Sequence, residues 1–364
     1  MKILDKYILF RYLKSVFFTL FIFIPIAVVI DVSEKVDKFL QHDDLTFIHI
    51  LKDYYLNFIM YYANTFLPLA TFIACIMFTS KLASNTEVIA ISSANISFTR
   101  FLRPYFIGAT ILAIIALGMN HFVVPKGNEI KYAFEQEYIF NKRTENRSFV
   151  KDFSLQLNDS AKIFIKNFSL LNRKGYNFSY AEFDGIKIKH RVVAENITWD
   201  KENGNFILSK YKERFIQDEK DSITSGDKKT MILDFTPDDL IISGSKSMEM
   251  TSDRLSEFID KSERRGVKNL NAYYVELYQR TSLPVSAYIL TLIAVSLSSR
   301  KKRGGTGINL AIGIGLMFMY VFFMKVAVVL GSAPNSNALL MAWLPNIIFS
   351  TIAVYLYIRE KKQG

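Results

Sequence analysis

The residues best placed for chemistry in this sequence are basic side chains near the ends of long apolar runs. Lysines follow the first and third runs, an arginine precedes the fourth, and a lysine lies inside the fifth: Lys35, Lys38, Lys126, Lys131, Arg280 and Lys325. Ionisable residues inside an apolar span usually face a protein interior or a cavity, and they form a functional hypothesis by default. The competing explanations are snorkelling of Lys325, interfacial anchoring by Arg280, and mutual pairing of the charges in 31–38 along one helical turn.

A second candidate site is the segment 81–103, between the second and third apolar runs. We expect a short helix there. Ser84 and Glu87 have the spacing of a capping box, which by itself would make Glu87 a structural residue. Alternatively, a helix that exposes Val88 and Ile91 beside a single carboxylate would dock into a partner's groove that contains a basic residue.

Catalytic and metal-binding signatures are missing from the sequence. There is no G-x-x-x-x-G-K-[ST] phosphate loop, and residues 304–307 lack both its lysine and a preceding strand. The four histidines are scattered without metal-ligand spacing, and no G-x-S-x-G motif occurs. Cys75 inside an apolar run is more typical of a small apolar filler than of a nucleophile. We therefore expect neither an enzyme nor a cofactor.

Charge-free runs would position the candidate residues. The chain has 364 residues, and 50% of them are hydrophobic. A bilayer core needs about 20 apolar residues per helix. The shortest run continues past Arg11 and Lys14, whose side chains can snorkel. We therefore predict six transmembrane helices, three before and three after a polar block, over residues 15–30, 54–80, 104–125, 281–299, 304–324 and 338–358.

The net charge of +11 indicates the orientation of these helices. With six spans, both termini lie on one side together with 81–103 and 300–303, and these segments contain 14 Lys and Arg against three Asp and Glu. The remaining residues sum to zero. Because basic loop residues favour the cytoplasm, we expect both termini to be cytoplasmic and no nucleic-acid partner. The first run is too long for a signal peptide and lacks a small-x-small cleavage site.

The polar block is expected to be an antiparallel β domain. Apolar and polar residues alternate at 152–158 and 186–192, which is typical of half-buried strands. Turn signals separate further strand-like runs at 162–168, 176–183, 196–200, 205–212 and 231–235. Seven or eight short strands favour a sandwich or jelly roll. A surface helix is expected over 252–265, where Gly266 would end it.

The predicted fold class is therefore an α+β membrane protein with six transmembrane helices (3+3) and an inserted periplasmic β-jellyroll domain. The expected domains are four: 1–125 with the first three helices and the cytoplasmic helix near 84–93, 126–250 with the β domain, 251–280 with connecting helices, and 281–364 with the last three helices.

Short motifs in a fixed order resemble one family along nearly the whole chain. They are LDKYI at 4–8, FLPLA at 66–70, KLASNTEVIA at 81–90, VPKGNE at 124–129, TPDDL at 236–240, ELYQRTSLP at 276–284 and RGG at 303–305. Each motif is weak alone, but their order and spacing resemble the LptF/LptG permease family, the membrane subunits of the lipopolysaccharide export transporter. The start of the chain is more similar to LptG than to LptF.

The resemblance implies a permease subunit in the inner membrane of a Gram-negative bacterium. Its expected partners are a homologous permease subunit, two copies of a cytoplasmic ATPase, lipopolysaccharide and a periplasmic jellyroll bridge protein. By this resemblance the helix near 84–93 is the coupling helix, with Ser84, Glu87, Val88 and Ile91 as its contact residues. Basic residues at the outer boundary would bind lipid phosphates through charge-assisted hydrogen bonds: Lys35, Lys38, Lys126, Lys131, Arg280 and Lys325.

Departures from the family pattern concern these lipid contacts. Asp31 and Tyr61 stand where family members commonly have basic residues, and Tyr132 and Glu135 stand where arginines are expected. A lipid with fewer phosphates would fit these differences. Three other classes stay open: the permease of another envelope lipid or lipoprotein exporter, a non-transporting membrane anchor with an envelope-binding β domain, and an intramembrane enzyme.

Overall fold

The computed structural model describes residues 2–139, 149–158, 160–169, 172–201, 203–216, 221–237, 244–267, 270–300 and 305–363. The chain forms two compact units. The first contains Met1–Ile139, Ser247–Leu255 and Asn271–Gly364, and the second contains Phe140–Lys246 and Ser256–Leu270. The expected domain boundaries stay predictions; the first unit continues to Ile139, beyond the expected end of the first domain at residue 125. Lys301, Lys302 and Arg303 of the predicted topology lie outside the described residues, as does the end of the TPDDL motif.

Six helices in the described part of the first unit are long and apolar enough to cross a membrane, which confirms the predicted number and order. Each extends beyond its charge-free run, so the charges between Asp31 and Lys38 lie on the first helix and do not follow it. The six helices are α1 (Ile3–Phe39), α3 (Leu56–Ser84), α5 (Phe98–Gly118), α9 (Asn271–Ser298), α10 (Gly305–Gly331) and α11 (Ala338–Gln363).

Short helical segments connect or extend three of these spans. Helix α4 (Glu87–Ser93) joins α3 to α5, and α2 (Phe47–His49) precedes α3. Three π-helical turns occur next to them: η1 (Ile50–Tyr55) before α3, and η2 (Met119–Val123) and η3 (Glu135–Ile139) on either side of α6 (Val124–Phe134). A π-helical turn changes the direction in which the neighbouring side chains point, and such turns are frequent at functional sites.

Helices α3 and α9 form the centre of the bundle and are the most buried of the spans. Hydrogen bonds connect them to their neighbours: Tyr12 and Thr291 hydroxyls lie 2.9 Å apart, as do those of Thr79 and Tyr105. Interhelical hydrogen bonds of this kind hold membrane helices together, because lipid offers no alternative partner. Gly108 permits the close approach of α5 to α1, since a Cβ there would lie 2.6 Å from Tyr12 Cδ1.

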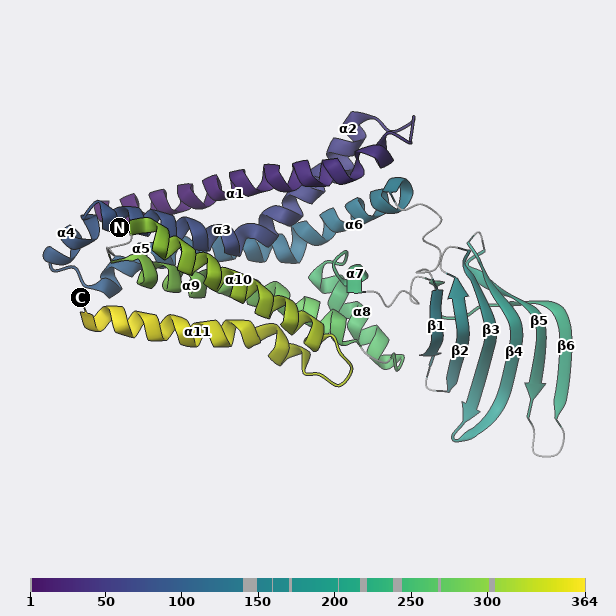
Figure 1. Cartoon of the computed structure of the whole chain (residues 1–364). Coiled ribbons are helices and arrows are strands. Elements are labelled where there is room, and N and C mark those ends of the chain that lie inside the picture. The colour runs from purple at the N-terminus through teal and green to yellow at the C-terminus, as the bar shows by residue number, and fades with distance from the viewer. Residues whose placement is uncertain are drawn as a thin grey trace. The chain divides into compact units, whose positions relative to one another are not determined.

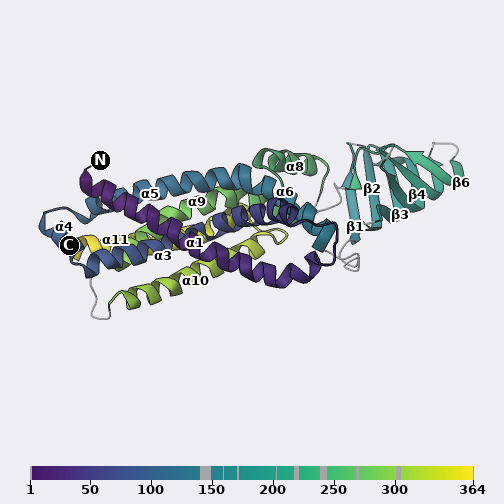
Figure 2. The ribbon, with the colours of Figure 1, turned by 90° about the horizontal axis from the view of Figure 1, so that it is seen from above.

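Both chain termini and α4 lie at the same end of the bundle, which we call the terminal end (Figures 1 and 2). The opposite end, where α1 finishes at Phe39 and α6 continues into η3, is called the far end. Because six spans are an even number, the chain ends on the same side of the membrane on which it begins. The helices therefore present two separate sets of charged residues, one at each end.

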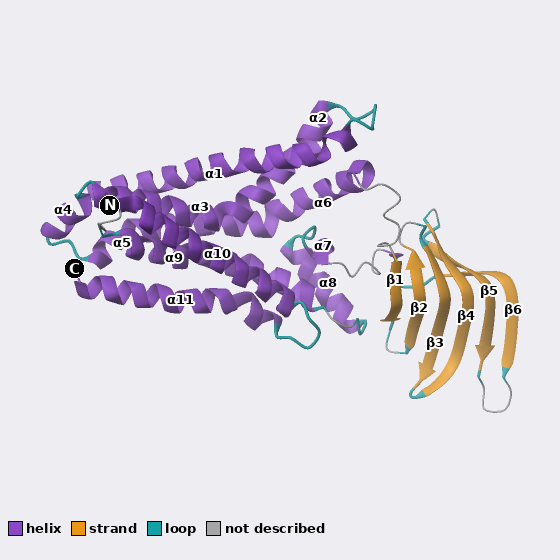
Figure 3. Ribbon diagram, in the orientation of Figure 1, coloured by secondary structure: helices purple, strands orange, loops and turns teal. Residues whose placement is uncertain are grey.

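The second unit contains a six-stranded antiparallel sheet whose strand order follows the chain (Figure 3). Its strands are β1 (Phe149–Gln156), β2 (Ala161–Ser169), β3 (Lys174–Asp184), β4 (Lys187–Asp200), β5 (Asn205–Phe215) and β6 (Ser222–Met231). The inserted antiparallel domain is thus confirmed. Seven or eight strands were expected in a sandwich or jelly roll, whereas the described residues contain six in one sheet. Two predicted strands, at 186–192 and 196–200, are one strand because β4 stays paired through Val193 and Ala194, and of the run 231–235 only Met231 belongs to a strand.

One face of the sheet is apolar, but the side-chain alternation changes phase in the middle of the strands. Ile165 pairs with Phe178, and three residues further Phe168 pairs with Gly175, yet all four are buried. Two consecutive exposed or half-exposed residues separate them, and Asn177 has a φ of 55°, in the left-handed region. A Cβ at Gly175 would lie 2.8 Å from Phe168 Cδ2, so glycine is required at this position.

Beyond the sheet, the predicted surface helix is confirmed as α8 (Ser252–Arg264), and Gly266 follows it at a φ of 65°.

Candidate functional site

A cluster of charged and hydroxyl groups connects three elements at the far end. Asp31 and Lys35 come from α1, Tyr54 from η1 and Glu135 from η3. Lys35 Nζ lies 2.8 Å from Asp31 Oδ1 and 3.4 Å from Glu135 Oε1. Lys35 also donates to the Tyr54 hydroxyl, which lies 3.1 Å from Asp31 Oδ1 and 3.4 Å from Glu135 Oε1. The pairing expected within 31–38 is therefore present, but a carboxylate from a distant segment completes it.

Aromatic rings surround this far-end cluster. The ring centroids of Phe39 and Tyr54 are 5.8 Å apart, and those of Tyr54 and Phe134 are 5.4 Å apart. These rings belong to a buried group that also contains Tyr55 and Phe58. Because apolar surroundings lower the local dielectric, the attraction between Lys35 and its two carboxylates is stronger than it would be in water. The cluster therefore fixes the end of α1 to the segments before α3 and after α6.

Lys131 lies on α6, one turn before Glu135, and is only 7% exposed. Its Nζ lies 4.9 Å from the ring centroid of Tyr61 and 4.6 Å from that of Tyr132. Cation–π contacts of this type stabilise a desolvated ammonium group. No carboxylate of the described residues lies within salt-bridge distance of it. Tyr61 and Tyr132, which stand where basic residues were expected, are thus the direct neighbours of this lysine.

Arg280 on α9 belongs to a separate network and is 3% exposed. Its guanidinium donates to Glu276 Oε1 at 3.3 Å, to Ser252 Oγ at 3.0 Å and to the carbonyl oxygens of Ser247 and Met250, both at 2.8 Å. All these contacts are with protein groups, mostly in the segment between α7 (Gly244–Ser247) and α8.

Two further side chains hold the same segment. His121 Nδ1 lies 2.6 Å from Ser252 Oγ, and Asn128 Nδ2 donates to the Met248 carbonyl at 3.1 Å. Arg280, His121 and Asn128 therefore clamp residues 247–252 onto α9, η2 and α6. The sequence suggested interfacial anchoring or lipid contact for Arg280. Its contacts with the backbone carbonyls of residues 247–252 could not be predicted, because no sequence pattern marks them.

The other three basic candidates are exposed. Lys38 lies on the last turn of α1, Lys126 near the start of α6 and Lys325 on α10. None of them has an ion pair within the described part of the chain. The structure therefore pairs Lys35 with Glu135, places Lys131 one helical turn before Glu135 and holds Arg280 in its own network, whereas Lys38, Lys126 and Lys325 are exposed.

At the terminal end, α4 begins at Glu87 and not at Ser84. Thr86, at a φ of 61°, precedes it, and the expected capping box is wrong because Ser84 is the last residue of α3 and donates to the Lys81 carbonyl at 2.9 Å. The Glu87 carboxylate instead accepts hydrogen bonds from the Tyr7 hydroxyl at 3.2 Å and from Asn85 Nδ2 at 3.3 Å. Glu87 is thus connected directly to α1.

The outward face of α4 also differs from the expectation. Val88 and Ile91 pack against the core of the bundle, whereas Ile89 is 55% exposed. The turn at Asn85 and Thr86 rotates α4 so that these two residues face inward. Ile89 is therefore an exposed apolar residue of α4 that the sequence analysis did not identify.

An ion pair fixes the start of α1 to the first turn of α5. Arg100 Nη1 and Nη2 donate to the two Asp5 oxygens at 2.7 and 2.8 Å, and the backbone N–H of Lys2 donates to Asp5 Oδ2 at 2.9 Å. A bidentate Arg–carboxylate pair restricts orientation as well as distance.

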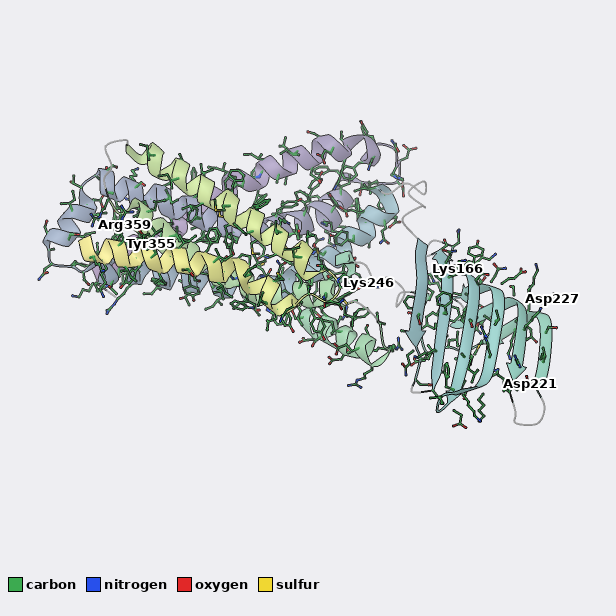
Figure 4. All side chains as sticks on the ribbon, turned by 60° about the horizontal axis from the view of Figure 1, so that its bottom comes forward. Lys166, Asp221, Asp227, Lys246, Tyr355 and Arg359 are labelled. Carbon is green, nitrogen blue, oxygen red and sulfur yellow. The ribbon has the colours of Figure 1, made fainter. Side chains whose placement is uncertain are left out.

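Figure 4 shows Arg359 on the last turns of α11, near the C-terminal end of that helix.

Within the described residues, no group of three His, Cys, Asp or Glu side chains is placed to hold a metal ion. The architecture is that of a multi-pass membrane protein with an inserted antiparallel sheet and a short helix between its second and third spans. Comparison with known families narrows this class further. Residues 6–359 match the family described as lipopolysaccharide export system permease LptF/LptG, so the chain belongs to that family.

This family is the permease of the lipopolysaccharide export system, which makes the chain a component of a transporter and not itself an enzyme. Its spanning helices agree with a multi-pass protein of the inner membrane. Comparison with curated proteins finds no matching sequence.

Proposed function

We propose that this chain is a permease subunit that extracts lipopolysaccharide from the inner membrane and passes it to a periplasmic jellyroll bridge protein. The family match over residues 6–359 is the observation that carries the proposal. In this proposal the terminal end is cytoplasmic, because the basic segments lie there, and the β unit is periplasmic. The chain would pair with a homologous permease subunit, and its LDKYI start is more similar to LptG than to LptF.

Energy would come from two copies of a separate cytoplasmic ATPase that dock on α4. Glu87 and Ile89 support this role, since one offers a carboxylate and the other an exposed apolar side chain. A partner groove with a basic residue would complement them. Because Glu87 also accepts a hydrogen bond from Tyr7, closure of the ATPase would act on α1 through that contact.

Lipid would bind at the far end. Lys38, Lys126 and Lys325 are exposed and have no ion pair among the described residues, so they are suited to reach phosphate oxygens, and Lys131 has no carboxylate within salt-bridge distance in that part of the chain. Lys35 and Arg280 are already occupied by protein groups and would act by holding α1 and the 247–252 segment in place. A far end with few unpaired basic side chains would suit a lipid that carries few phosphate groups.

Handover to the bridge protein would use an open edge of the sheet. Strands β1 and β6 are the two edges of the sheet in the described part of the chain, although the Gln156 N–H of β1 already donates to the Arg265 carbonyl at 2.8 Å. An extended edge can accept a further strand from a neighbouring domain through backbone hydrogen bonds. This gives the inserted domain a direct part in transfer.

Co-purification tests the proposal. A tagged chain extracted with mild detergent should recover an ATPase and a homologous permease. Recovery of a lipoprotein-specific partner set would favour another exporter, and recovery of neither subunit would favour a membrane anchor. Binding of mono- and bis-phosphorylated lipid A to the purified complex tests the substrate: a strong preference for the bis form would contradict the low-phosphate assignment.

A further inference from the structure

The terminal end contains a groove between α1 and α3 with a volume of about 580 Å³. We propose that this groove binds an anionic phospholipid. The inference does not depend on the transported substrate; it requires only that the six helices span a membrane. It concerns the opposite end of α1 from the far-end cluster.

The groove has a polar half and an apolar half. Tyr7, Arg11 and Lys14 line it near the start of α1, and Phe18 lines it further along the same helix face, with Ala74 and Met77 of α3. These α1 residues are three or four positions apart, which places them on one face. From Arg11 to Phe18 the helix rises by about 10 Å. A phosphate bound by the two cations would therefore have room for an attached acyl chain beside Phe18.

The charges of the groove have no partner in the described part of the chain. Arg11 and Lys14 are exposed, and no carboxylate lies within salt-bridge distance of either. Two other arginines at this end are paired, Arg100 with Asp5 at 2.7 Å and Arg300 with Glu360 at 2.6 Å, whereas Arg103 and Arg359 have no ion pair among the described residues and do not line the groove. Arg11 Cζ lies 5.4 Å from the ring centroid of Tyr7, which restricts the guanidinium without neutralising it. The anion that balances Arg11 and Lys14 must therefore come from outside the described residues.

The apolar half identifies that anion as a lipid. Phe18 is 63% exposed and Met77 54% exposed, and Ala74 between α1 and α3 leaves space beside them. A free phosphate would use only the two cations, whereas a phospholipid also covers the apolar surface. Basic pockets between transmembrane helices bind anionic headgroups in this way.

The groove is distinct from the proposed export site. Lys14 and Lys35 are separated by about 30 Å along the helix axis, roughly the thickness of a bilayer core. A lipid bound at Arg11 and Lys14 therefore belongs to the other leaflet from one bound at the far end. Such a lipid would brace the start of α1, close to the contact between Tyr7 and Glu87.

Native mass spectrometry of the purified full-length chain, alone and in its complex, tests the inference. The probes are palmitoyl-oleoyl phosphatidylglycerol and phosphatidylcholine, which have the same acyl chains and differ in charge. We expect one phosphatidylglycerol to remain bound at activation energies that remove phosphatidylcholine. The double variant Arg11→Gln/Lys14→Gln should weaken that retention about tenfold, because two headgroup contacts are lost.

Arg103→Gln is the matched control, since Arg103 is exposed at the same end and does not line the groove. It should retain phosphatidylglycerol like the unmodified chain. Equal retention in the double variant, or equal retention of phosphatidylcholine, would show ordinary snorkelling and overturn the inference. Because the isolated chain can be measured, failure of ATPase co-purification would count against the proposed export function and leave this result interpretable.

Discussion

Lys35 Nζ lies 3.4 Å from Glu135 Oε1, although the two residues are 100 positions apart in the sequence. The contact joins α1 to the segment that follows α6, and Asp31 and Tyr54 complete it. A lysine expected to bind a phosphate is thus already neutralised by protein carboxylates. Its first role is to hold the far end of α1.

Lys35→Ala should destabilise the helical unit. The substitution leaves Asp31 and Glu135 without their cation in apolar surroundings, which typically costs about 3 kcal/mol. Chemical denaturation of the detergent-solubilised chain would measure the change in the free energy of unfolding. Lys38→Ala, on the exposed side of α1, is the control and should change it by less than about 0.5 kcal/mol. Equal effects of both variants would mean that the cluster does not hold α1.

Glu87→Ala should uncouple transport. The variant removes the carboxylate of α4 that contacts Tyr7 and, as proposed, the ATPase, while the far-end lysines stay unchanged. Lipid binding should therefore be largely retained and ATP-driven release lost. Thr351→Ala on α11 is the control, because that hydroxyl donates only to the Ile347 carbonyl of its own helix. Full transport and full ATPase association in Glu87→Ala would contradict the coupling role.

Arg280→Lys should loosen the segment 247–252. A lysine keeps the charge but cannot reproduce the guanidinium's simultaneous contacts with Ser247, Met250 and Ser252. Hydrogen exchange of residues 247–252 in the full-length chain should accelerate by about tenfold or more, whereas Lys325→Gln should leave it unchanged. If exchange stayed slow while lipid binding fell, Arg280 would be a ligand contact and not a clamp.

Gly108→Ala should separate α1 from α5. The added Cβ would lie 2.6 Å from Tyr12 Cδ1, a distance that forces the Tyr12 ring or the helix to move. Overpacking of this kind costs about 1–3 kcal/mol. Gly118→Ala is the matched control on the same helix, because nothing lies within 4 Å of its added Cβ. Thermal unfolding of both variants in detergent measures the difference, and similar midpoints would contradict the packing argument.

Glu213 should make the β unit sensitive to acid. Burial raises the pKa of this carboxyl, but hydrogen bonds from Lys229 at 2.5 Å and His190 at 2.8 Å outweigh burial and lower the pKa below its ordinary value of 4.5. A carboxyl with a lowered folded-state pKa stabilises the fold above its ordinary value, and this stabilisation disappears as the pH falls below it.

The fluorescence of Trp199, which packs on Phe206 in this unit, reports unfolding in a Trp343→Phe background. Stability should fall as the pH drops below about 4.5, and Glu213→Gln should flatten that part of the profile. An unchanged profile would assign the acid sensitivity to other groups.

The sequence by itself determined the six spans, the place of the β block between them and the helix at 252–265, but not the number of strands. Charge-free runs defined six spans because a bilayer core excludes charges, and alternation defined the β block because a half-buried strand must alternate. The predicted helix over 252–265 was also confirmed, because the residues that begin and end a helix act locally in the sequence. Ordered motifs were sufficient for the family, which the match over residues 6–359 confirms.

Only the tertiary structure decided which charges are free. The π-helical turns η1, η2 and η3 bring Tyr54, His121 and Glu135 to the far end, and no local pattern marks these turns. The side of α4 that faces outward depends on one turn at Thr86, so Ile89 is exposed whereas Val88 and Ile91 pack against the bundle. A sequence shows how many lysines stand at a membrane boundary, but their partners come from distant segments, as the contact between Lys35 and Glu135 does.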